Sequence, residues 1–391
     1  GDGMFPAAFS NLDDKRVSTA VAYLDAATRA RTNLRIYSNT TVERLIVTGQ
    51  RAHGVVAMSA GGERLQIDAA EVIVSAGALQ SPALLLRAGI GAGSELQALG
   101  IPVVADRPGV GRNLQDHPSL TFCHFLDPEF RMPLSRRRAS MTAARFSSGL
   151  DGCDNADMYL SSATRAAWHA LGNRLGLFFL WCNRPFSRGR VQLTSADPFT
   201  PPRVDLNLLD DERDARRMAI GVRRVAQIVQ QTALHRHPDD FFPAAFSPRV
   251  KALSRFSAGN AALTKVLGLA LDTPAPLRRW IIDTFVTGGI RMSALLADDK
   301  ELDAFIRKYV FGVWHASGTC RMGPASDRMA VTNQEGLVHD VANLRVVDAS
   351  LMPKLPSANT NIPTIMMAEK IADAILARRK APPGVLVSSE A

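Results

Sequence analysis

Short runs of apolar and β-branched residues, separated by turn residues, dominate the first part of the chain. They lie at Asn33–Tyr37, Thr41–Val47 and His53–Met58, with turn signals at Thr48-Gly49 and Gly61-Gly62. Such runs, bounded by glycine-containing turns, are typical of β-strands. The pattern therefore predicts a strand-rich segment here.

A strand, a small-residue turn and a helix are predicted next along the chain. Glu71–Ser75 is a short apolar run, Ala76-Gly77 is a turn, and a helix is expected from Ser81-Pro82 to Ala88. Ser81 suits the N-cap and Pro82 the first helical position. In open α/β sheets such a junction often faces a phosphate or a cofactor ring, so a ligand is expected near it.

The middle of the chain has a different character. Strands are predicted at Leu175–Trp181 and Arg190–Thr194, a charged helix at Asp210–Gln231, and loops over Pro238–Pro248. Separate runs of strands and helices favour an α+β domain. Glycine turns and buried strands return from residue 311. A strand is predicted at Leu344–Val347, a helix at Pro363–Arg379, and a frayed tail over residues 381–391.

Composition places the chain among globular proteins of enzyme size. It has 391 residues, of which 46% are hydrophobic and 21% charged, which excludes a disordered or fibrous protein. Its longest apolar runs fall far short of the ~20 residues that span a bilayer, so no integral membrane segment is expected.

The charge balance is basic, with 46 Lys and Arg against 37 Asp and Glu. Such a field suits an anionic ligand, a membrane surface or nucleic acid. The densest run, Arg136-Arg137-Arg138, lacks flanking aromatic residues and a groove-reading helix, so nucleic-acid binding is not expected.

The four cysteines are widely spaced and form no C-x-x-C pair. This pattern predicts reduced thiols, no metal site and a cytoplasmic protein, with peripheral contact with the inner membrane as an alternative location. The chain begins at Gly1 and shows no secretion signal, so the expectation is that its start is cut.

The stretch from Trp314 to Gly323 holds the strongest candidate for chemistry. His315 follows an aromatic residue and precedes a small-residue turn, and histidine is the side chain best matched to proton transfer near neutral pH. The alternative is a core histidine bonded to a backbone carbonyl, which this segment taken alone favours.

Several ordered segments resemble the glucose–methanol–choline (GMC) oxidoreductases, flavoenzymes that oxidise alcohols with FAD. Val346–Pro353, Asn359–Thr364 and Met366–Asp373 are similar to the C-terminal signature of that family. The other matching segments are Gly77–Gly91, Pro108–His117, Ser187–Gly189 and Ser195–Pro198.

The chain also departs from the family pattern. Ala88 stands where serine is usual and Asp340 where glycine is common. The strand–G-x-G-x-x-G–helix that binds the FAD pyrophosphate is absent from these residues, since Gly89–Gly93 follows a helix instead. The resemblance therefore implies the later part of a GMC protein.

The implied fold is α/β plus α+β. An incomplete Rossmann-like FAD-binding domain would comprise residues 1–125 and 311–380. A substrate domain on an antiparallel sheet, residues 126–310, would be inserted between them.

The resemblance also implies site residues. His315 would be the catalytic base, and Asn359, which is histidine in several relatives, would hydrogen-bond the alcohol oxygen. Residues expected at FAD are Val42 beside the adenine, Gly77, Trp314, Asp348, Ala349, and Asn361, Pro363 and Thr364 against the flavin.

Alternatives remain for these residues. His117 is a rival base, although a loop histidine that fixes the chain near the flavin is the favoured interpretation. Asn359 and Asn361 could simply be helix caps. Cys320 is expected to be a small buried residue rather than a nucleophile.

The expected function is oxidation of a small primary alcohol to an aldehyde, with oxygen or a quinone-type molecule as the final electron acceptor. Two alternatives remain: a GMC-type hydroxynitrile lyase, and an inactive truncated chain unable to retain FAD. Nothing in residues 126–310 suggests the aromatic or acidic cage that a choline-like cation requires.

Overall fold

The computed structural model describes residues 2–13, 15–133, 135, 139–232, 240–244 and 252–380. The Arg136–Arg138 run, the tail 381–391 and most of the loop predicted at Pro238–Pro248 lie outside the described residues. The chain folds into two compact units. The first contains Gly1–Arg35, Pro118–Asn183 and Asp211–Phe311, and the second contains Ile36–His117, Arg184–Asp210 and Gly312–Ala391.

A seven-stranded sheet forms the centre of the first unit, in the order β1-β11-β12-β13-β10-β16, with β17 also paired to β10. The ladders along the β1 to β16 path are antiparallel, so the predicted antiparallel sheet is confirmed. The strands are β1 (Gly3–Pro6), β10 (Pro118–Phe125), β11 (Ser140–Phe146), β12 (Met158–Ala163), β13 (Leu175–Cys182), β16 (Phe241–Pro243) and β17 (Phe311–Gly312).

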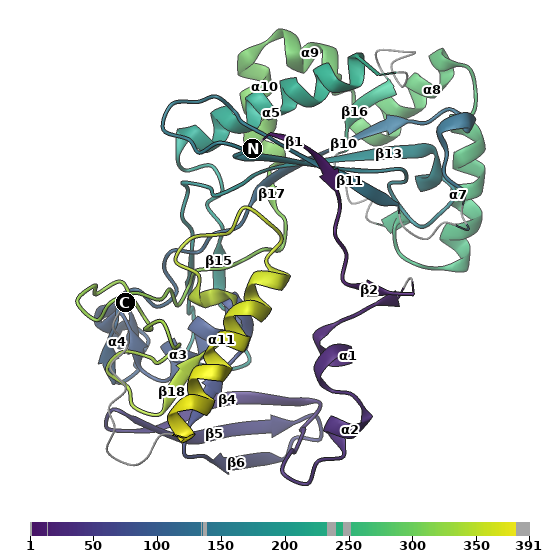
Figure 1. The fold of residues 1–391 in the computed structure, drawn as a ribbon. Coiled ribbons are helices and arrows are strands. Elements are labelled where there is room, and N and C mark those ends of the chain that lie inside the picture. Colours follow the sequence, from purple (N-terminus) through teal and green to yellow (C-terminus); the bar gives the residue numbers. More distant parts are fainter. Residues whose placement is uncertain are drawn as a thin grey trace. The chain divides into compact units, whose positions relative to one another are not determined.

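Helices pack on this sheet, and Figure 1 shows α5 and α10 together on one side of it. Helix α5 confirms the predicted charged helix, with Asp211 as its N-cap accepting the Arg213 N–H. The helices are α1 (Thr19–Tyr23), α2 (Ala26–Arg29), α5 (Glu212–Gln230), α7 (Ala258–Leu271), α8 (Ala275–Ile282), the π-helix η4 (Asp283–Thr287), α9 (Met292–Ala297) and α10 (Asp299–Tyr309). Short elements complete the unit: β2 (Asn11–Leu12), β3 (Lys15–Arg16), and the 3₁₀ turns η1 (Pro128–Phe130) and η2 (Gly172–Arg174).

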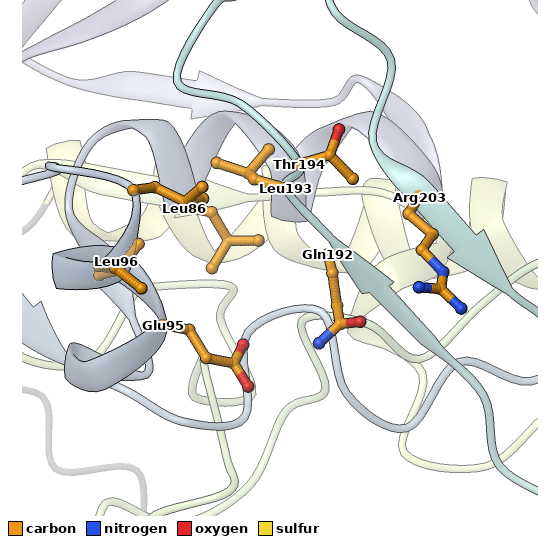
Figure 2. A pocket seen from close by; sticks show the side chains of 9 residues that line it. Leu86, Glu95, Leu96, Gln192, Leu193, Thr194 and Arg203 are labelled. Carbon is orange, nitrogen blue, oxygen red and sulfur yellow. The ribbon is translucent and has the colours of Figure 1, made fainter.

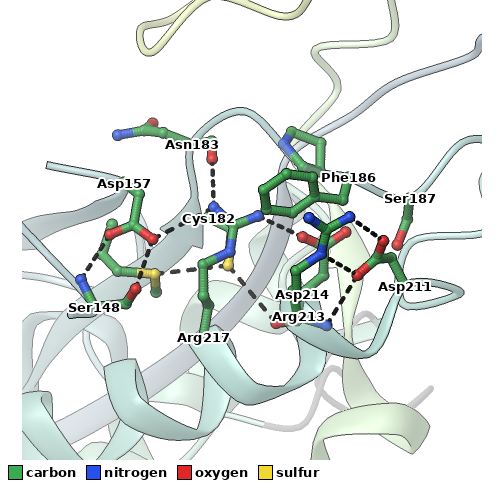
Figure 3. Close-up of polar contacts among 12 residues, drawn as sticks. Ser148, Asp157, Cys182, Asn183, Phe186, Ser187, Asp211, Arg213, Asp214 and Arg217 are labelled. Atoms are coloured by element: carbon green, nitrogen blue, oxygen red, sulfur yellow. Dashed lines mark hydrogen bonds and ion pairs between the residues drawn. The ribbon is translucent and has the colours of Figure 1, made fainter. Parts of the chain in front are cut away.

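A buried ion cluster ties α5 to the sheet (Figure 3). Arg217 is only 1% exposed, and it pairs with Asp214 one turn earlier and with Asp157 at 3.5 Å. Its guanidinium also donates to the Asn183 carbonyl at 2.9 Å. Because an unpaired buried charge costs several kcal/mol, as a general order of magnitude, this cluster fixes where α5 sits on the sheet.

The second unit begins with the antiparallel sheet β4-β5-β6, and a β-bulge between Val42 and Arg44 interrupts the β4–β5 ladder. Strands β7 and β18 pair in parallel, with Val72 opposite Leu344. The strands of this unit are β4 (Thr40–Thr48), β5 (Arg51–Ser59), β6 (Arg64–Asp68), β7 (Val72–Val74), β8 (Ile90–Gly91), β9 (Ala105–Asp106), β14 (Arg190–Gln192), β15 (Arg203–Asp205) and β18 (Leu344–Val346). The strands predicted at 41–47, 53–58 and 344–347 are therefore confirmed.

The strand predicted at Asn33–Tyr37 is wrong. Leu34 N donates to the Arg31 carbonyl in a turn, and the side chains of Ile36 and Tyr37 are about half exposed. A strand requires a neighbouring strand to complete its ladder, and no described strand pairs with these residues.

The helix predicted after Ser81-Pro82 starts earlier than expected. Helix α3 runs over Gly77–Arg87, with Pro82 inside it. Proline cannot donate to the carbonyl four residues before it, which is that of Ala78. The hydroxyl of Thr319 donates to this carbonyl at 2.6 Å instead, so a partner distant in sequence makes the proline tolerable.

The predicted C-terminal helix is confirmed as α11 (Asn361–Lys380). It contributes the buried Ile371 to a core shared with α3, β7 and β18. The other helical elements of this unit are α4 (Gly93–Ala98) and the 3₁₀ turn η5 (Ala349–Leu351). Across the described chain, no helix combines the length and apolar character that crossing a membrane requires.

The compact units do not follow the domain ranges expected from the sequence. Residues 1–35 belong with the seven-stranded sheet, because β1 pairs with β11. Residues 184–210 belong to the second unit, where β14 pairs with β15. The assignment of these ranges to cofactor and substrate binding stays a prediction.

Candidate active site

The segment Gln115–His117 organises the candidate site, which lies within the second unit. Gln115 exchanges backbone hydrogen bonds with Ser317, both at 3.0 Å. Its side-chain Oε1 accepts the Leu355 N–H at 3.1 Å. One buried residue therefore joins the segment after His315 to the segment before Asn359.

Two histidines meet edge to face in this site. His117 Nδ1 lies 2.9 Å from His315 Nδ1, and the ring planes are 89° apart. His117 is fully buried, and its Nε2 lies 3.0 Å from the Pro356 carbonyl oxygen. Burial lowers the pKa of His117 to about 3, with the neighbouring His315 adding to the effect. Burial likewise lowers the pKa of His315 to about 4.

The carboxylate of Asp116 holds the main chain of both histidines. Its Oδ1 accepts the backbone N–H groups of His117 at 2.8 Å, Val313 at 3.1 Å and His315 at 3.0 Å. Trp314, between the last two, has φ of 61°, a left-handed conformation that is rare for a bulky residue. Burial raises the pKa of Asp116 to about 6, despite these donors.

The structure brings the two predicted catalytic residues together. Asn359 Nδ2 lies 3.4 Å from His315 Nε2. The Asn359 side chain is exposed, and Trp314 is 82% exposed. The imidazole therefore has one nitrogen toward the protein interior and the other toward an accessible polar group.

The structure also joins Gly77 and Asp348, two residues expected at FAD. The Asp348 carboxylate accepts the Gly77 N–H at 2.9 Å, the Ser81 hydroxyl at 2.5 Å and the Ser350 N–H at 2.8 Å. Asp348 is 8% exposed. Through these hydrogen bonds its buried carboxylate connects the start of α3 to η5. The adjacent Ala349 carbonyl accepts the Gly318 N–H at 3.1 Å, which links this cluster to the His315 segment.

The remaining predicted cofactor residues lie on the first turn of α11 and on β4. Asn361 is exposed, while Pro363 and Thr364 are half-buried. Thr364 bonds through both its N–H and its hydroxyl to the Thr360 carbonyl. Val42 lies at the β-bulge of β4 and is 38% exposed.

A cavity of about 300 Å³ lies elsewhere in this unit (Figure 2). It contains none of the predicted site residues. Its lining residues are Leu86, Glu95, Leu96, Ala98, Leu99, Gln192, Leu193, Thr194 and Arg203. Cys320 is fully buried, and burial raises the pKa of its thiol, in agreement with the expected packing role.

Sequence reasoning missed the supporting residues Gln115, Asp116 and Pro356. Gln115 and Asp116 belong to Pro108–His117, one of the segments that resemble the family. Their spacing in the sequence does not connect them with residues about 200 positions later. An acidic residue directly before a candidate histidine was the signal available in the sequence.

Comparison with known proteins places the chain in a family. Residues 3–119 match the N-terminal and residues 185–368 the C-terminal domain of the GMC oxidoreductases. The chain belongs to the GMC oxidoreductase family, and the predicted resemblance is confirmed.

Two relatives illustrate the similarity. The chain is 42% identical over 378 residues to 5-(hydroxymethyl)furfural oxidase of Methylovorus sp. (strain MP688), covering 96% of this chain and 63% of the relative. It is 34% identical to the oxygen-dependent choline dehydrogenase of Burkholderia thailandensis, covering 93% of this chain and 60% of the relative. The chain thus spans less than two thirds of these relatives. Because both are named as an oxidase or a dehydrogenase, the hydroxynitrile lyase alternative gains no support.

Solved structures show the same fold. Pyridoxine 4-oxidase from Mesorbium loti superposes with a TM-score of 0.70 at 23% identity, over 96% of this chain and 64% of that protein. Formate oxidase superposes with a TM-score of 0.67 at 22% identity, over 87% of this chain and 60% of that protein. The expected combination of a flavoenzyme-type α/β part and an antiparallel sheet is confirmed.

Proposed function

We propose that this chain is the catalytic part of an FAD-dependent oxidoreductase that oxidises a primary alcohol to an aldehyde. The observation that carries the proposal is the pairing of His315 Nε2 with Asn359 Nδ2, 3.4 Å apart. Family membership and the names of the relatives support the same chemistry.

The residues present fit the flavin end of FAD. The exposed Trp314 and Asn359 border His315, and the 20-residue helix α11 begins two residues after Asn359. A helix N-terminus favours negative charge, which a reduced flavin carries. Asn361, Pro363 and Thr364 would lie against the flavin, and Gly77 and Ala349 would line the cofactor. The bulge at Val42 would receive the adenine, since bulges often redirect a strand beside a ligand.

Alcohol oxidation requires three groups: a base, a donor that holds the oxygen, and an acceptor for hydride. FAD, when bound, accepts the hydride from the carbinol carbon. In our proposal His315 Nε2 takes the hydroxyl proton, and the Asn359 amide donates to the oxygen as negative charge develops on it. The carbinol C–H bond would break as the carbonyl forms, and the organic product would be an aldehyde.

The names of the relatives support a proposal for the substrate class and the electron acceptor. Hydroxymethylfurfural and choline both carry a CH₂OH group, which favours a small primary alcohol. The names of both relatives refer to an oxidase or to oxygen, so we propose oxygen as the first acceptor to test and a quinone as the second. We also propose that the second unit binds FAD and that the sheet of the first unit binds substrate.

Anaerobic flavin reduction tests the proposal directly. The chain, joined to the glycine-rich nucleotide-binding segment of a relative where it does not hold FAD alone, is mixed with a primary alcohol such as hydroxymethylfurfural. Bleaching of the flavin absorbance together with aldehyde formation is expected. A yellow, folded protein that no primary alcohol in a broad panel bleaches would contradict the proposal.

A further inference from the structure

We propose that His117 is a positioning residue that holds His315 in the Nδ1–H tautomer and so leaves Nε2 as the proton-accepting atom. The catalytic meaning of this inference rests on the proposed function. The tautomer itself is a property of the chain alone.

The direction of the hydrogen bonds follows from the Pro356 carbonyl. A carbonyl oxygen can only accept, so the 3.0 Å contact requires that His117 Nε2 carries a hydrogen. A neutral imidazole has one N–H, and therefore His117 Nδ1 is an acceptor. The 2.9 Å contact between the two Nδ1 atoms then requires that His315 Nδ1 is the donor.

The same reasoning determines whether the outer nitrogen of His315, Nε2, carries a hydrogen. With the hydrogen on Nδ1, a neutral His315 has a bare Nε2, and this atom faces the Asn359 amide Nδ2 at 3.4 Å. An amide nitrogen donates, so the Asn359 contact agrees with a lone pair on Nε2. A single direction of donation runs from Asn359 through His315 and His117 to Pro356.

Burial keeps this arrangement neutral. His117 is fully buried, and burial lowers the pKa of both imidazoles well below 7. The nearby carboxylate of Asp116 directs its Oδ1 at backbone N–H groups. The two rings therefore share one hydrogen between their Nδ1 atoms at neutral pH.

The arrangement gives His117 a role distinct from that of a base. Both of its ring nitrogens are hydrogen-bonded and none of its surface is exposed, so the rival-base interpretation has no accessible lone pair. When His315 gains a proton at Nε2, its Nδ1–H already points at the His117 lone pair. That contact stabilises the imidazolium, and the ring does not have to turn.

Nitrogen NMR tests the tautomers without cofactor or substrate. The chain is labelled with ¹⁵N-histidine, and long-range ¹H–¹⁵N correlations are recorded at pH 7, because protonated and bare ring nitrogens resonate far apart. We expect His117 as the Nε2–H form and His315 as the Nδ1–H form. His315 as the Nε2–H form in the unaltered chain would overturn the proposal, and this measurement requires no variant.

Two substitutions separate positioning from packing. His117→Leu removes the acceptor, and His315 is then expected to become a mixture of tautomers. His117→Gln keeps an acceptor and a donor on one planar group, and we expect His315 to stay in the Nδ1–H form. An unchanged His315 tautomer in a folded His117→Leu chain would overturn the proposal.

His339 provides a matched control. Its Nε2 lies 3.1 Å from the Gly323 carbonyl, the same type of contact as that between His117 and Pro356. His339→Leu is expected to leave the His315 signals unchanged.

In the FAD-loaded enzyme, His117→Leu should lower turnover by at least tenfold, and His117→Gln should recover most of the loss. A wrong tautomer costs roughly 10⁴-fold in a hydrolase triad. Should the expected NMR pattern occur in a chain that oxidises no alcohol, only the proposed function fails.

Discussion

The backbone N–H of His315 donates to Asp116 Oδ1 at 3.0 Å. The same oxygen accepts the N–H of His117, the neighbour of Asp116 in sequence. One buried carboxylate therefore sets the separation of two main-chain segments whose imidazoles meet 2.9 Å apart. The geometry of the site depends on this anion as much as on the rings.

The effect of replacing Asp116 on stability should depend on whether the new side chain can accept the backbone N–H groups that Asp116 now accepts. Asp116→Leu leaves three backbone N–H groups without this acceptor and should cost at least about 3 kcal/mol, since each such loss costs about 1–3 kcal/mol. Asp116→Asn keeps an acceptor and should stay within about 1 kcal/mol of the natural chain. Urea unfolding measures the free energy of unfolding of both variants. Equal losses would show that the hydrogen bonds to Asp116 Oδ1 do not contribute to stability.

The pH dependence of stability should carry a signature of Asp116. Its pKa in the folded chain is about 6, above the value of about 3.9 expected in the unfolded chain. Between these values the folded state binds more protons, so the contribution of Asp116 is largest below pH 4 and is lost as the pH rises through 6.

The two histidines act in the opposite direction, since their lowered pKa values reduce stability as the pH falls below about 6.5. Both the natural chain and Asp116→Asn contain these histidines. Most of the histidine contribution therefore cancels when the unfolding free energy of one chain is subtracted from that of the other. This difference should fall from pH 4 to pH 6.5 and then become level. A level difference throughout would contradict the raised pKa.

Thr319 should stabilise the proline-containing helix α3. Thr319→Val removes the hydroxyl that donates to the Ala78 carbonyl, and a buried carbonyl left unpaired should cost about 1–3 kcal/mol. Pro82→Ala supplies the missing N–H, so adding it to Thr319→Val should recover part of the loss. Urea unfolding of the two single variants and the double variant forms a mutant cycle. Strict additivity would exclude this coupling.

His315→Ala should lower turnover by about 10²–10⁴-fold, the usual scale for a lost general base. FAD affinity should change little, because the imidazole faces the substrate side in our proposal. Stopped-flow flavin reduction and FAD titration measure the two effects separately. Flavin reduction within a few-fold of normal would remove His315 as the base.

Asn359→Asp distinguishes a catalytic asparagine from a helix cap. A cap needs only an acceptor and would tolerate the carboxylate, whereas the proposed role requires the amide donor. A defect of roughly 10²–10³-fold in turnover is expected, with little change in melting temperature. Normal turnover would take Asn359 out of the site.

Local patterns in the sequence were enough to predict many of the elements. Runs of apolar and β-branched residues between turn residues indicated β4 and β5, a buried strand was predicted at β18, and a long charged stretch indicated α5. These features depend on neighbours a few residues away, which the sequence displays directly. The strand expected at Asn33–Tyr37 failed because a strand exists only with a partner, and Pro82 misled because its correction, Thr319, is 237 positions away.

The candidate site shows the same division. His315 and Asn359 were predicted because the segments that contain them resemble the signatures of the GMC family. The neighbours of His315, and the hydrogen that each ring nitrogen carries, depend on the carbonyl of Pro356, the lone pair of His117 and the carboxylate of Asp116. These groups come from segments about 200 residues apart and meet only through folding. The sequence thus identified the candidate residues. The tautomers, burial and pKa values of the histidines and of Asp116 were decided by the tertiary structure, because they depend on atoms that folding brings within about 3 Å.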